Sequence, residues 1–282
     1  MNAPVNPKMT VSTSTSTPGS TPISMAGSTS TGGPQPQPST ILVAGATGKT
    51  GGPLVEQLLA QGHTVRAIVR SRHRLPAAVQ DHPALVVIEA SILDLTDGQL
   101  EEIVEGCDAV VSCLGHVLNL RGVFGAPRKL CTEATRRLCD AIESHRPATP
   151  TRFVLMNTVG VSNPALSESR TLLDRAVVTC LRWLVPPHSD NEDAAAHLHS
   201  QVGDRSEFIE WCSVRPDSLI CEEVSAYDVV ESPVTGIFSG RPTSRANVAH
   251  FMTRLIGDDD VWARWRFKMP VIMNEQAALP AA

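Results

Sequence analysis

The sequence has no Cys-x-x-Cys pair, no apolar run near the ~20 residues that a membrane span needs, and no surplus of positive charge. Its seven cysteines are an odd number and are expected to be reduced thiols, which favours a cytoplasmic protein. The net charge of −5 argues against a broad electrostatic attraction to nucleic acid or to an anionic membrane surface. We therefore expect a cytoplasmic protein whose partners include neither nucleic acid nor a membrane.

Acidic residues are absent from the first forty positions, which contain sixteen Ser or Thr, seven Pro and one Lys. Such a segment buries too little apolar surface to offset the entropy that ordering removes. It also lacks the apolar core of a secretory signal and the arginines of a transit peptide. Residues 1–39 are therefore predicted to form a disordered Ser/Thr/Pro-rich tail, and residues 40–282 a single domain.

From position 40 onward, short apolar runs alternate with segments of helical spacing. This alternation is typical of βαβ units and predicts an α/β fold with one Rossmann-type, doubly wound parallel sheet and helices on both faces. Strands are predicted at 40–44, 63–70, 85–89, 108–113, 152–156, 208–214 and 226–230, and helices at 53–60, 97–104, 128–144 and 245–256.

Segments near 160–205 and 222–282 are assigned to the substrate side of the domain. The first of them carries an apolar stripe at helical spacing over 172–184, which Pro186 and Pro187 are expected to end. We interpret this stripe as core or as a cover over the site.

A glycine-rich segment, Gly45-Ala-Thr-Gly48-Lys-Thr-Gly51, lies between the first strand and the first helix. A phosphate must come close to backbone N–H groups at a helix N-terminus, and a Cβ at the points of approach would block it. A nucleoside-triphosphate P-loop would need glycine where Val43 stands, which argues against that alternative. The order of strand, loop and helix predicts a dinucleotide site formed by Gly45, Ala46, Thr47, Gly48, Lys49, Thr50 and Gly51.

The charge at the end of the second strand indicates which dinucleotide is bound. NAD sites usually place an acidic residue there, about 20 residues after the loop, to bind the ribose hydroxyls. This sequence has no acidic residue between Glu56 and Asp81, and it has Arg70 instead, with Arg72 and Arg74 close by. Because a guanidinium at Arg70 can bind a 2′-phosphate bidentately, NADP(H) is the predicted cofactor.

These features resemble the atypical short-chain dehydrogenase/reductases, and within them the NmrA-like and biliverdin-IXβ (flavin) reductase-like proteins. Besides the glycine loop, the resemblance rests on Asp108-Ala-Val-Val-Ser-Cys-Leu-Gly115, Phe153-Val-Leu-Met-Asn-Thr158 and Ile209-Glu-Trp-Cys-Ser-Val-Arg-Pro216. It implies that the glycine loop lines the diphosphate and that Arg70 binds the adenosine phosphate. It also adds Ser91, Leu114, Gly115 and Asn157 to the cofactor site, with Ser91 in the adenine-facing position that is commonly an Asp.

The resemblance also shows which catalytic groups this sequence lacks. Orthodox members use a Tyr-x-x-x-Lys dyad, in which the lysine lowers the pKa of the phenol so that it can exchange a proton. The one tyrosine here, Tyr227, is followed four positions later by Glu231, and Asn191 stands where related proteins often carry a lysine. Standard alcohol or ketone dehydrogenation is therefore not expected. Thr158, Asn191 and His116 remain as catalytic candidates.

Histidines are the other residues in the sequence that could carry chemistry. His116 directly follows the fourth strand and its Gly115, where open α/β sheets bind ligands, so it is a candidate proton donor. His197 and His199 point to different faces of a helix and lack the spacing of a zinc site, so no metal is expected. Asp190 or Asn191 is predicted to cap the N-terminus of the helix that contains them.

These predictions leave alternative functions open. The first is an NADPH-dependent oxidoreductase that reduces a small conjugated acceptor such as a flavin, a quinone or an enone, with hydride transfer promoted by proximity. The second is a non-catalytic NADP(H)-binding redox sensor of the NmrA-like type, which would have a protein partner. An isomerase or epimerase that keeps its cofactor tightly bound is a third.

Overall fold

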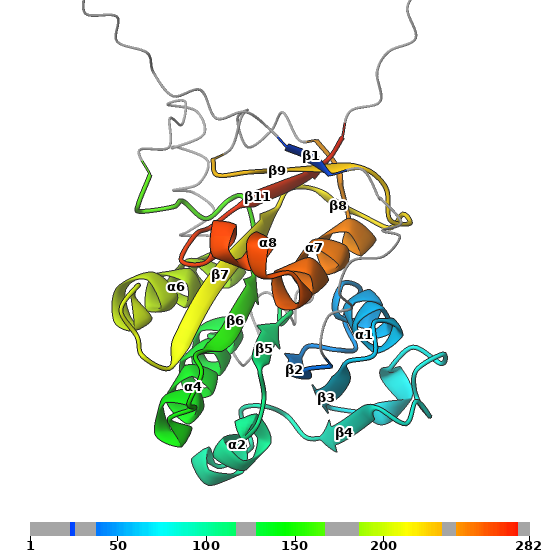
Figure 1. The fold of residues 1–282 in the computed structure, drawn as a ribbon, viewed down its shortest axis with the longest axis vertical. Helices are drawn as coiled ribbons and strands as arrows, with labels where there is room; N and C mark the ends of the chain where they lie inside the picture. The colour runs from blue at the N-terminus through cyan, green and yellow to red at the C-terminus, as the bar shows by residue number, and fades with distance from the viewer. Residues whose placement is uncertain (1–22, 26–37, 117–127, 167–185, 233–240, 276–282) are drawn as a thin grey trace, which may run out of the picture.

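The computed structural model of the chain describes residues 23–25, 38–116, 128–166, 186–232 and 241–275 (Figure 1). Its strands are β1 (Ile23–Met25), β2 (Thr40–Ala44), β3 (Thr64–Val69), β4 (Leu85–Glu89), β5 (Ala109–Ser112), β6 (Thr151–Met156), β7 (Ile209–Pro216), β8 (Leu219–Ile220), β9 (Tyr227–Val230), β10 (Thr243–Ser244) and β11 (Val271–Asn274). Its helices are α1 (Gly51–Ala60), η1 (Arg72–Arg74), α2 (Asp97–Val104), α4 (Leu130–His145), α6 (Pro186–His197), η2 (Leu198–Val202), α7 (Arg245–Gly257) and α8 (Asp259–Trp265).

Nine of these strands form one sheet in the order β1-β9-β11-β7-β6-β5-β2-β3-β4. From β4 to β11 neighbouring strands are parallel, and β9 is antiparallel to both of its neighbours. The chain first builds the sheet outward from β2 to β4, then returns to the other side of β2 and builds it from β5 onward. This order confirms the predicted Rossmann-type fold. Sheets of this kind generally bind ligands at the carboxyl ends of the strands where the order reverses, which are β2 and β5 here.

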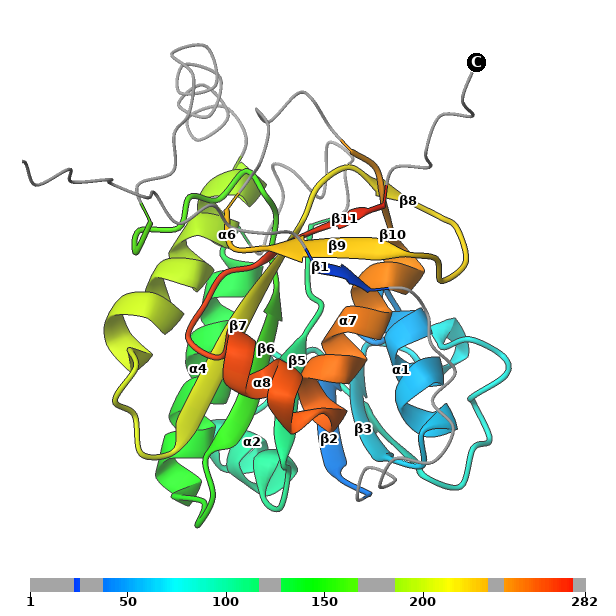
Figure 2. The same ribbon diagram turned by 45° about the horizontal axis from the view of Figure 1, so that its top comes forward.

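Helices cover both faces of the sheet, and each face has its own apolar core (Figure 2). Along β2 the buried side chains alternate: Ile41 and Val43 join the core under α1, α7 and α8, whereas Leu42 joins the core under α2, α4 and α6. Successive residues of a strand point to opposite faces, so a strand buried on both sides must be apolar at every position. This requirement explains the continuous apolar runs from which the strands were predicted.

Most predicted elements have the observed bounds or differ from them by one or two residues at an end. The main difference is at α6, which begins at Pro186, whereas the predicted helix began after a cap at Asp190 or Asn191. Proline is well tolerated in the first turn of a helix, because the N–H group that it lacks has no intrahelical acceptor there. The apolar stripe at 172–184, with the helix predicted for it, lies outside the described residues.

One segment of the predicted tail takes part in the sheet. Ile23–Met25 forms β1, which pairs antiparallel with Tyr227–Val229 at the edge of the sheet (Figure 2). Among the helices of the described ranges, none has both the length and the apolar character needed to cross a membrane.

A buried histidine next to β3 makes the stability of the fold depend on pH. Nδ1 of His63 accepts a hydrogen bond of 3.2 Å from the backbone N–H of Ser39, and its buried Nε2 has no partner among the described residues. Burial lowers the pKa of His63, although the carboxylate of Asp108 acts in the opposite direction. Burial likewise lowers the pKa of His197 and of His250.

We expect the free energy of unfolding to fall as the pH is lowered through the range just below about 6.5, the ordinary histidine pKa. In that range the unfolded chain binds protons that the buried histidines of the folded chain do not, so protonation favours unfolding. Urea titrations at about pH 7.5 and about pH 5.5 measure this difference. His63→Gln should reduce the difference in unfolding free energy between the two pH values, because glutamine does not titrate. Each unit of difference between the folded and unfolded pKa is worth about 1.4 kcal/mol. An unchanged pH dependence in the variant would exclude His63 as a source.

Candidate functional site

The glycines of the loop after β2 are required by close backbone contacts. Gly45 has a φ of +86°, and a Cβ built on it would lie 2.6 Å from the backbone O of Cys113. A Cβ on Gly51 would lie 2.2 Å from the backbone O of Gly45. Because both obstacles are main chain, a side chain at either position would displace the loop itself.

The same loop leads directly into α1. The backbone N–H of Gly48 donates to the O of Gly45 at 2.9 Å, and that of Gly52 donates to the O of Gly48 at 2.8 Å. In the described structure Thr50, the N-cap residue of α1, makes no capping hydrogen bond with its side chain, and the first turn contains no acidic residue. A helix N-terminus without its own cap or carboxylate suits an external anion, and the diphosphate of a dinucleotide fits this site.

The arginines that follow β3 have different surroundings. Arg70 is exposed at the end of the strand, as a ligand for an adenosine phosphate would need to be. The Arg72 guanidinium donates to the backbone O of Gln80 at 2.6 Å and lies 3.5 Å from a carboxylate oxygen of Asp81. Arg66, within β3 itself, donates to the backbone oxygens of Ile103 and Glu105 at the C-terminal end of α2, so it serves the fold. Arg70 is therefore the arginine best suited to the predicted phosphate contact.

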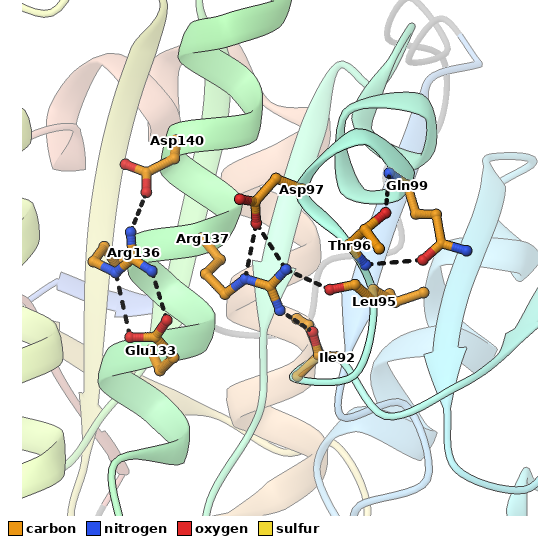
Figure 3. Close-up of polar contacts among 9 residues, drawn as sticks. All are labelled: Ile92, Leu95, Thr96, Asp97, Gln99, Glu133, Arg136, Arg137 and Asp140. Carbon is orange, nitrogen blue, oxygen red and sulfur yellow. Dashed lines mark hydrogen bonds and ion pairs between the residues drawn. The ribbon is translucent and has the colours of Figure 1, made fainter.

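Ser91, the predicted adenine-facing residue, lies between β4 and α2. Figure 3 shows how Arg137 of α4 holds the residues that follow it. Arg137 of α4 donates to the backbone oxygens of Ile92 at 2.9 Å and Leu95 at 2.5 Å, and pairs with Asp97 at 2.8 Å. At the end of the loop, the side chains of Thr96 and Gln99 form a reciprocal capping box that begins α2. The loop that carries the predicted adenine-facing residue is thus fixed by contacts that the sequence does not make evident.

The chain leaves β5 through Leu114, Gly115 and His116, which were predicted to lie near the nicotinamide. Nε2 of His116 lies 2.8 Å from Oδ2 of Asp190, a residue of α6. The Asp190 side chain is fully buried and that of His116 is 6% exposed. This His–Asp contact joins the end of β5 to a helix that is distant in sequence.

Asp190 caps a helix, but not the helix that was predicted. It lies inside α6, and its carboxylate accepts hydrogen bonds at the N-terminus of α4: from the N–H of Cys131 at 2.7 Å, the N–H of Thr132 at 2.9 Å and the hydroxyl of Thr132 at 2.6 Å. The predicted cap of its own helix is wrong because α6 begins at Pro186, a full turn earlier. Burial raises the pKa of Asp190, but these hydrogen bonds and that from His116 outweigh it and hold the pKa below its ordinary value.

The other two catalytic candidates lie beside α6 as well. The Asn157 side chain donates to the backbone O of Asn191 at 3.0 Å and accepts from the N–H of Thr158 at 2.9 Å. The hydroxyl of Thr158 accepts a long hydrogen bond of 3.4 Å from the N–H of Gly160. Thus α6 brings the residues after β6 close to those after β5, and His116, Asn157, Thr158 and Asn191 share one end of the sheet.

His116, Cys131 and Asp190 also have the ligand types of a metal site, with one ligand atom from each lying within 4.8 Å of the others. Two features argue against this interpretation. Both oxygens of Asp190 already accept hydrogen bonds. Burial, together with Asp190, raises the pKa of Cys131 well above its ordinary value, which disfavours the thiolate that a metal would bind.

Tyr227 lies away from this site, on the side of the sheet covered by α7. Its hydroxyl is hydrogen-bonded to Nδ1 of His250 at 2.9 Å, and burial raises its pKa to about 12. Lys268 pairs with Glu231 at 2.7 Å. These contacts agree with the prediction that this chain does not use a Tyr–Lys dyad.

Comparison with known proteins agrees with this geometry. A family model described as NAD(P)H-binding matches residues 45–259. An uncharacterized chloroplastic protein of Arabidopsis thaliana is 32% identical over 128 residues, which are 45% of this chain and 44% of the relative. The 3-diazoavenalumate denitrifying reductase of a Streptomyces species is 33% identical over 128 residues, which are 44% of this chain and 39% of that protein. The chain thus spans less than half of the length of these curated relatives.

Solved structures show the same fold at low sequence identity. The anaerobillin reductase ChuY of Escherichia coli O157:H7 superposes with a TM-score of 0.58 and 18% identity, over 86% of this chain and 100% of that chain. A short-chain dehydrogenase/reductase of Veillonella parvula superposes with a TM-score of 0.62 and 16% identity, over 86% of this chain and 97% of that chain. These similarities show the fold, and the family match confirms the NAD(P)H-binding character on which the predicted cofactor site rests.

Proposed function

Because the chain belongs to the NAD(P)H-binding family, we propose that it is an NADPH-dependent oxidoreductase that reduces a small conjugated acceptor such as a flavin, a quinone or an enone. The observation that carries this proposal is the arrangement of residues at the carboxyl ends of β2 and β5. One side is a glycine loop and an uncapped helix N-terminus, and the other side is a cluster of polar residues held by α6.

Different residues would bind the diphosphate and the 2′-phosphate of the cofactor. The backbone of the loop from Gly45 to Gly51 would bind the diphosphate, because the α1 N-terminus offers N–H donors and positive partial charge. Arg70 would bind the 2′-phosphate with its planar guanidinium, which favours NADPH over NADH. A Cβ on Gly115, at the end of β5, would meet no atom of the described residues within 4 Å.

When bound, NADPH supplies a hydride. The chain would contribute proximity: it holds the acceptor against the end of the sheet where Thr158, Asn191 and His116 lie. Their amide, hydroxyl and imidazole groups can orient the acceptor and exchange protons with it, which makes a Tyr–Lys dyad unnecessary. The names of two similar proteins, a denitrifying reductase and an anaerobillin reductase, support a reductive activity.

The proposal is tested by mixing purified protein and NADPH with a panel of flavins, quinones and enones and following the nicotinamide absorbance. We expect saturable oxidation of NADPH with at least one acceptor. We expect the activity to be lost in Gly51→Ala, which displaces the loop from Gly45 to Gly51, the proposed phosphate cradle. Tight NADPH binding with no oxidation across the panel would contradict the proposal. That outcome would favour the redox sensor, an alternative supported by the engagement of Tyr227 and Lys268 in contacts elsewhere.

A further inference from the structure

We propose that the outer edge of β9 is a strand-docking site, that Ile23–Met25 of the same chain is its occupant, and that this occupant keeps a second copy of the chain from pairing there. The observation that carries the proposal is the antiparallel pairing of β1 with β9 (Figure 2). The proposal gives the N-terminal segment a role in self-association, which goes beyond the proposed oxidoreductase function and does not depend on it.

Strand β9 is held in place by contacts that do not involve β1. On its inner side it pairs antiparallel with all four residues of β11. The side chains of Tyr227 and Val229 join the core under α7, and the Tyr227 hydroxyl is hydrogen-bonded to Nδ1 of His250 at 2.9 Å. Asp228 pairs with Arg241 at 2.9 Å. We therefore expect β9 to stay in place, as a formed edge, when β1 leaves it.

The β9 edge has few of the features by which sheet edges usually resist pairing with other chains. Such edges commonly carry prolines, lysines or bulges, or they are covered by another segment. The sequence of β9, Tyr-Asp-Val-Val, has no proline or lysine, and its register with β11 is uninterrupted. Its one charged residue, Asp228, pairs with Arg241. In the described part of the chain, the feature that protects this edge is therefore its covering by β1.

The pairing of β1 shows which kind of partner the edge accepts. Its three residues run antiparallel to β9, with Ile23 opposite Val229 and Ser24 opposite Asp228. The hydrogen bonds of such a pair come from the main chain, so they carry little sequence specificity. Another extended segment that approaches β9 in the antiparallel direction can therefore take the place of β1 when the edge is free.

The β9 strand of a second copy is such a segment. Two copies related by a twofold axis present the same strand to each other in antiparallel directions, so the contact is self-complementary and closes at a dimer. β9 has four residues and β1 has three, so two β9 strands could form a pairing at least as long as the one they replace. A second copy also brings this edge wherever the chain itself is present.

The covalent connection of β1 to the domain favours β1 over a second copy. Residues 26–39 join β1 to β2, and they include three prolines and no charged residue. A short connection of this kind makes docking intramolecular, with an effective concentration of about millimolar. A second copy at a lower concentration is therefore excluded while β1 is docked. Because β1 pairs through only three residues, loss of their main-chain donors should free the edge.

The opposite edge of the sheet, β4, provides an internal comparison. Among the described strands β3 is the one neighbour of β4, and Val86 of β4 is 49% exposed. This edge is equally open whether or not β1 is docked on β9. Self-association through β4 would therefore occur in the wild type as well, whereas association through β9 requires the release of β1.

The test uses the full chain and a variant in which β1 cannot donate hydrogen bonds. When Ile23→Pro, Ser24→Pro and Met25→Pro are combined, β1 has no backbone N–H group left, whichever of them faces β9. The matched control has the three prolines at residues 13–15, which are Thr, Ser and Thr in the same N-terminal segment. Light scattering coupled to size-exclusion chromatography measures the mass of each protein over about a hundredfold range of concentration.

We expect the mass to double with rising concentration in the triple-proline variant, and to stay constant in the wild type and in the control. Equal masses for variant and wild type at every concentration would overturn the proposal. Aggregates without a defined mass would overturn it too, because a twofold pair closes. Val86→Lys, added to the variant, should leave the doubling unchanged; loss of the doubling would place the contact at β4 and not at β9.

Hydrogen exchange of the β9 backbone measures the docking itself, at concentrations where each protein is monomeric. We expect the β9 amides that face β1 to exchange at least about tenfold faster in the triple-proline variant than in the wild type, and to regain protection when the variant is concentrated. Unchanged exchange would show that β1 does not occupy the edge. Fast exchange that concentration does not slow would show that no second copy binds there. Either result overturns the proposal.

The same experiment shows whether the variant is folded. The amides of β2 and β5, in the centre of the sheet, should exchange as in the wild type, because β9 and the sheet are held without β1. Loss of their protection would contradict that independence and overturn the proposal. None of these measurements involves NADPH or an acceptor, so failure of the proposed function leaves this test intact.

Discussion

Replacing Gly51 by alanine is expected to abolish tight NADPH binding and to lower the stability of the fold. The new Cβ would lie 2.2 Å from the backbone O of Gly45, 2.9 Å from its carbonyl carbon and 3.1 Å from the Cα of Ala46. None of these atoms belongs to a flexible side chain, so the loop must move. Overpacking of this kind costs about 1–3 kcal/mol, and the movement also misplaces the N–H groups that bind the diphosphate.

Calorimetric titration with NADPH and thermal unfolding measure the two effects. We expect the Kd to rise at least about tenfold, which corresponds to about 1.4 kcal/mol. Gly98→Ala is the matched control, because Gly98 lies in α2 and a Cβ there would meet no atom within 4 Å in the part of the chain that the structure describes. The control should bind NADPH normally and be slightly more stable, since alanine favours a helix over glycine by about 1 kcal/mol. Normal NADPH binding by Gly51→Ala would show that the diphosphate lies elsewhere.

Arg70→Ala should weaken NADPH binding by about ten- to a hundredfold, because hydrogen bonds to charged groups are worth about 1.5–3 kcal/mol. NADH lacks the 2′-phosphate, so its affinity should be almost unchanged. The ratio of the two Kd values, measured by titration with each cofactor, isolates the contribution of the phosphate. The exposure of Arg70 makes the substitution itself well tolerated.

Arg72→Ala is the natural control for this experiment, two residues further along the chain. The Arg72 guanidinium already donates to Gln80 and pairs with Asp81, so it is less available to a phosphate. We expect the ratio of NADPH to NADH affinity to stay close to that of the wild type. Equal losses for both cofactors in Arg70→Ala would remove the physical basis for the predicted NADP(H) preference.

The fold and the phosphate cradle were predictable because their signals are local. β2 ends at Ala44, the next residue Gly45 has a φ of +86° that breaks the extended run, and α1 begins at Gly51. Strand, turn and helix N-terminus thus lie within one short stretch of sequence, and each has its own residue pattern. The same is true of β4 and α2, whose predicted and observed bounds agree.

The polar contacts of the site were not predictable in this way. Asp190 is 59 residues from Cys131 and 74 residues from His116 in sequence, so no spacing pattern connects them. Arg137 reaches its carbonyl acceptors over 42 and 45 residues. Asp is a common N-cap residue, but the sequence does not say which helix N-terminus Asp190 caps.

The contact between Gly45 and the backbone that follows β5 has a consequence for how this protein can change. It ties the cradle to the start of the segment that carries the histidine by main-chain packing, so their separation is insensitive to most side-chain replacements. New acceptors are therefore more readily gained by altering residues around the crevice than by moving its two ends. Under the proposed function, the range of acceptors can change while the spacing between the glycine loop and the end of β5 stays constant.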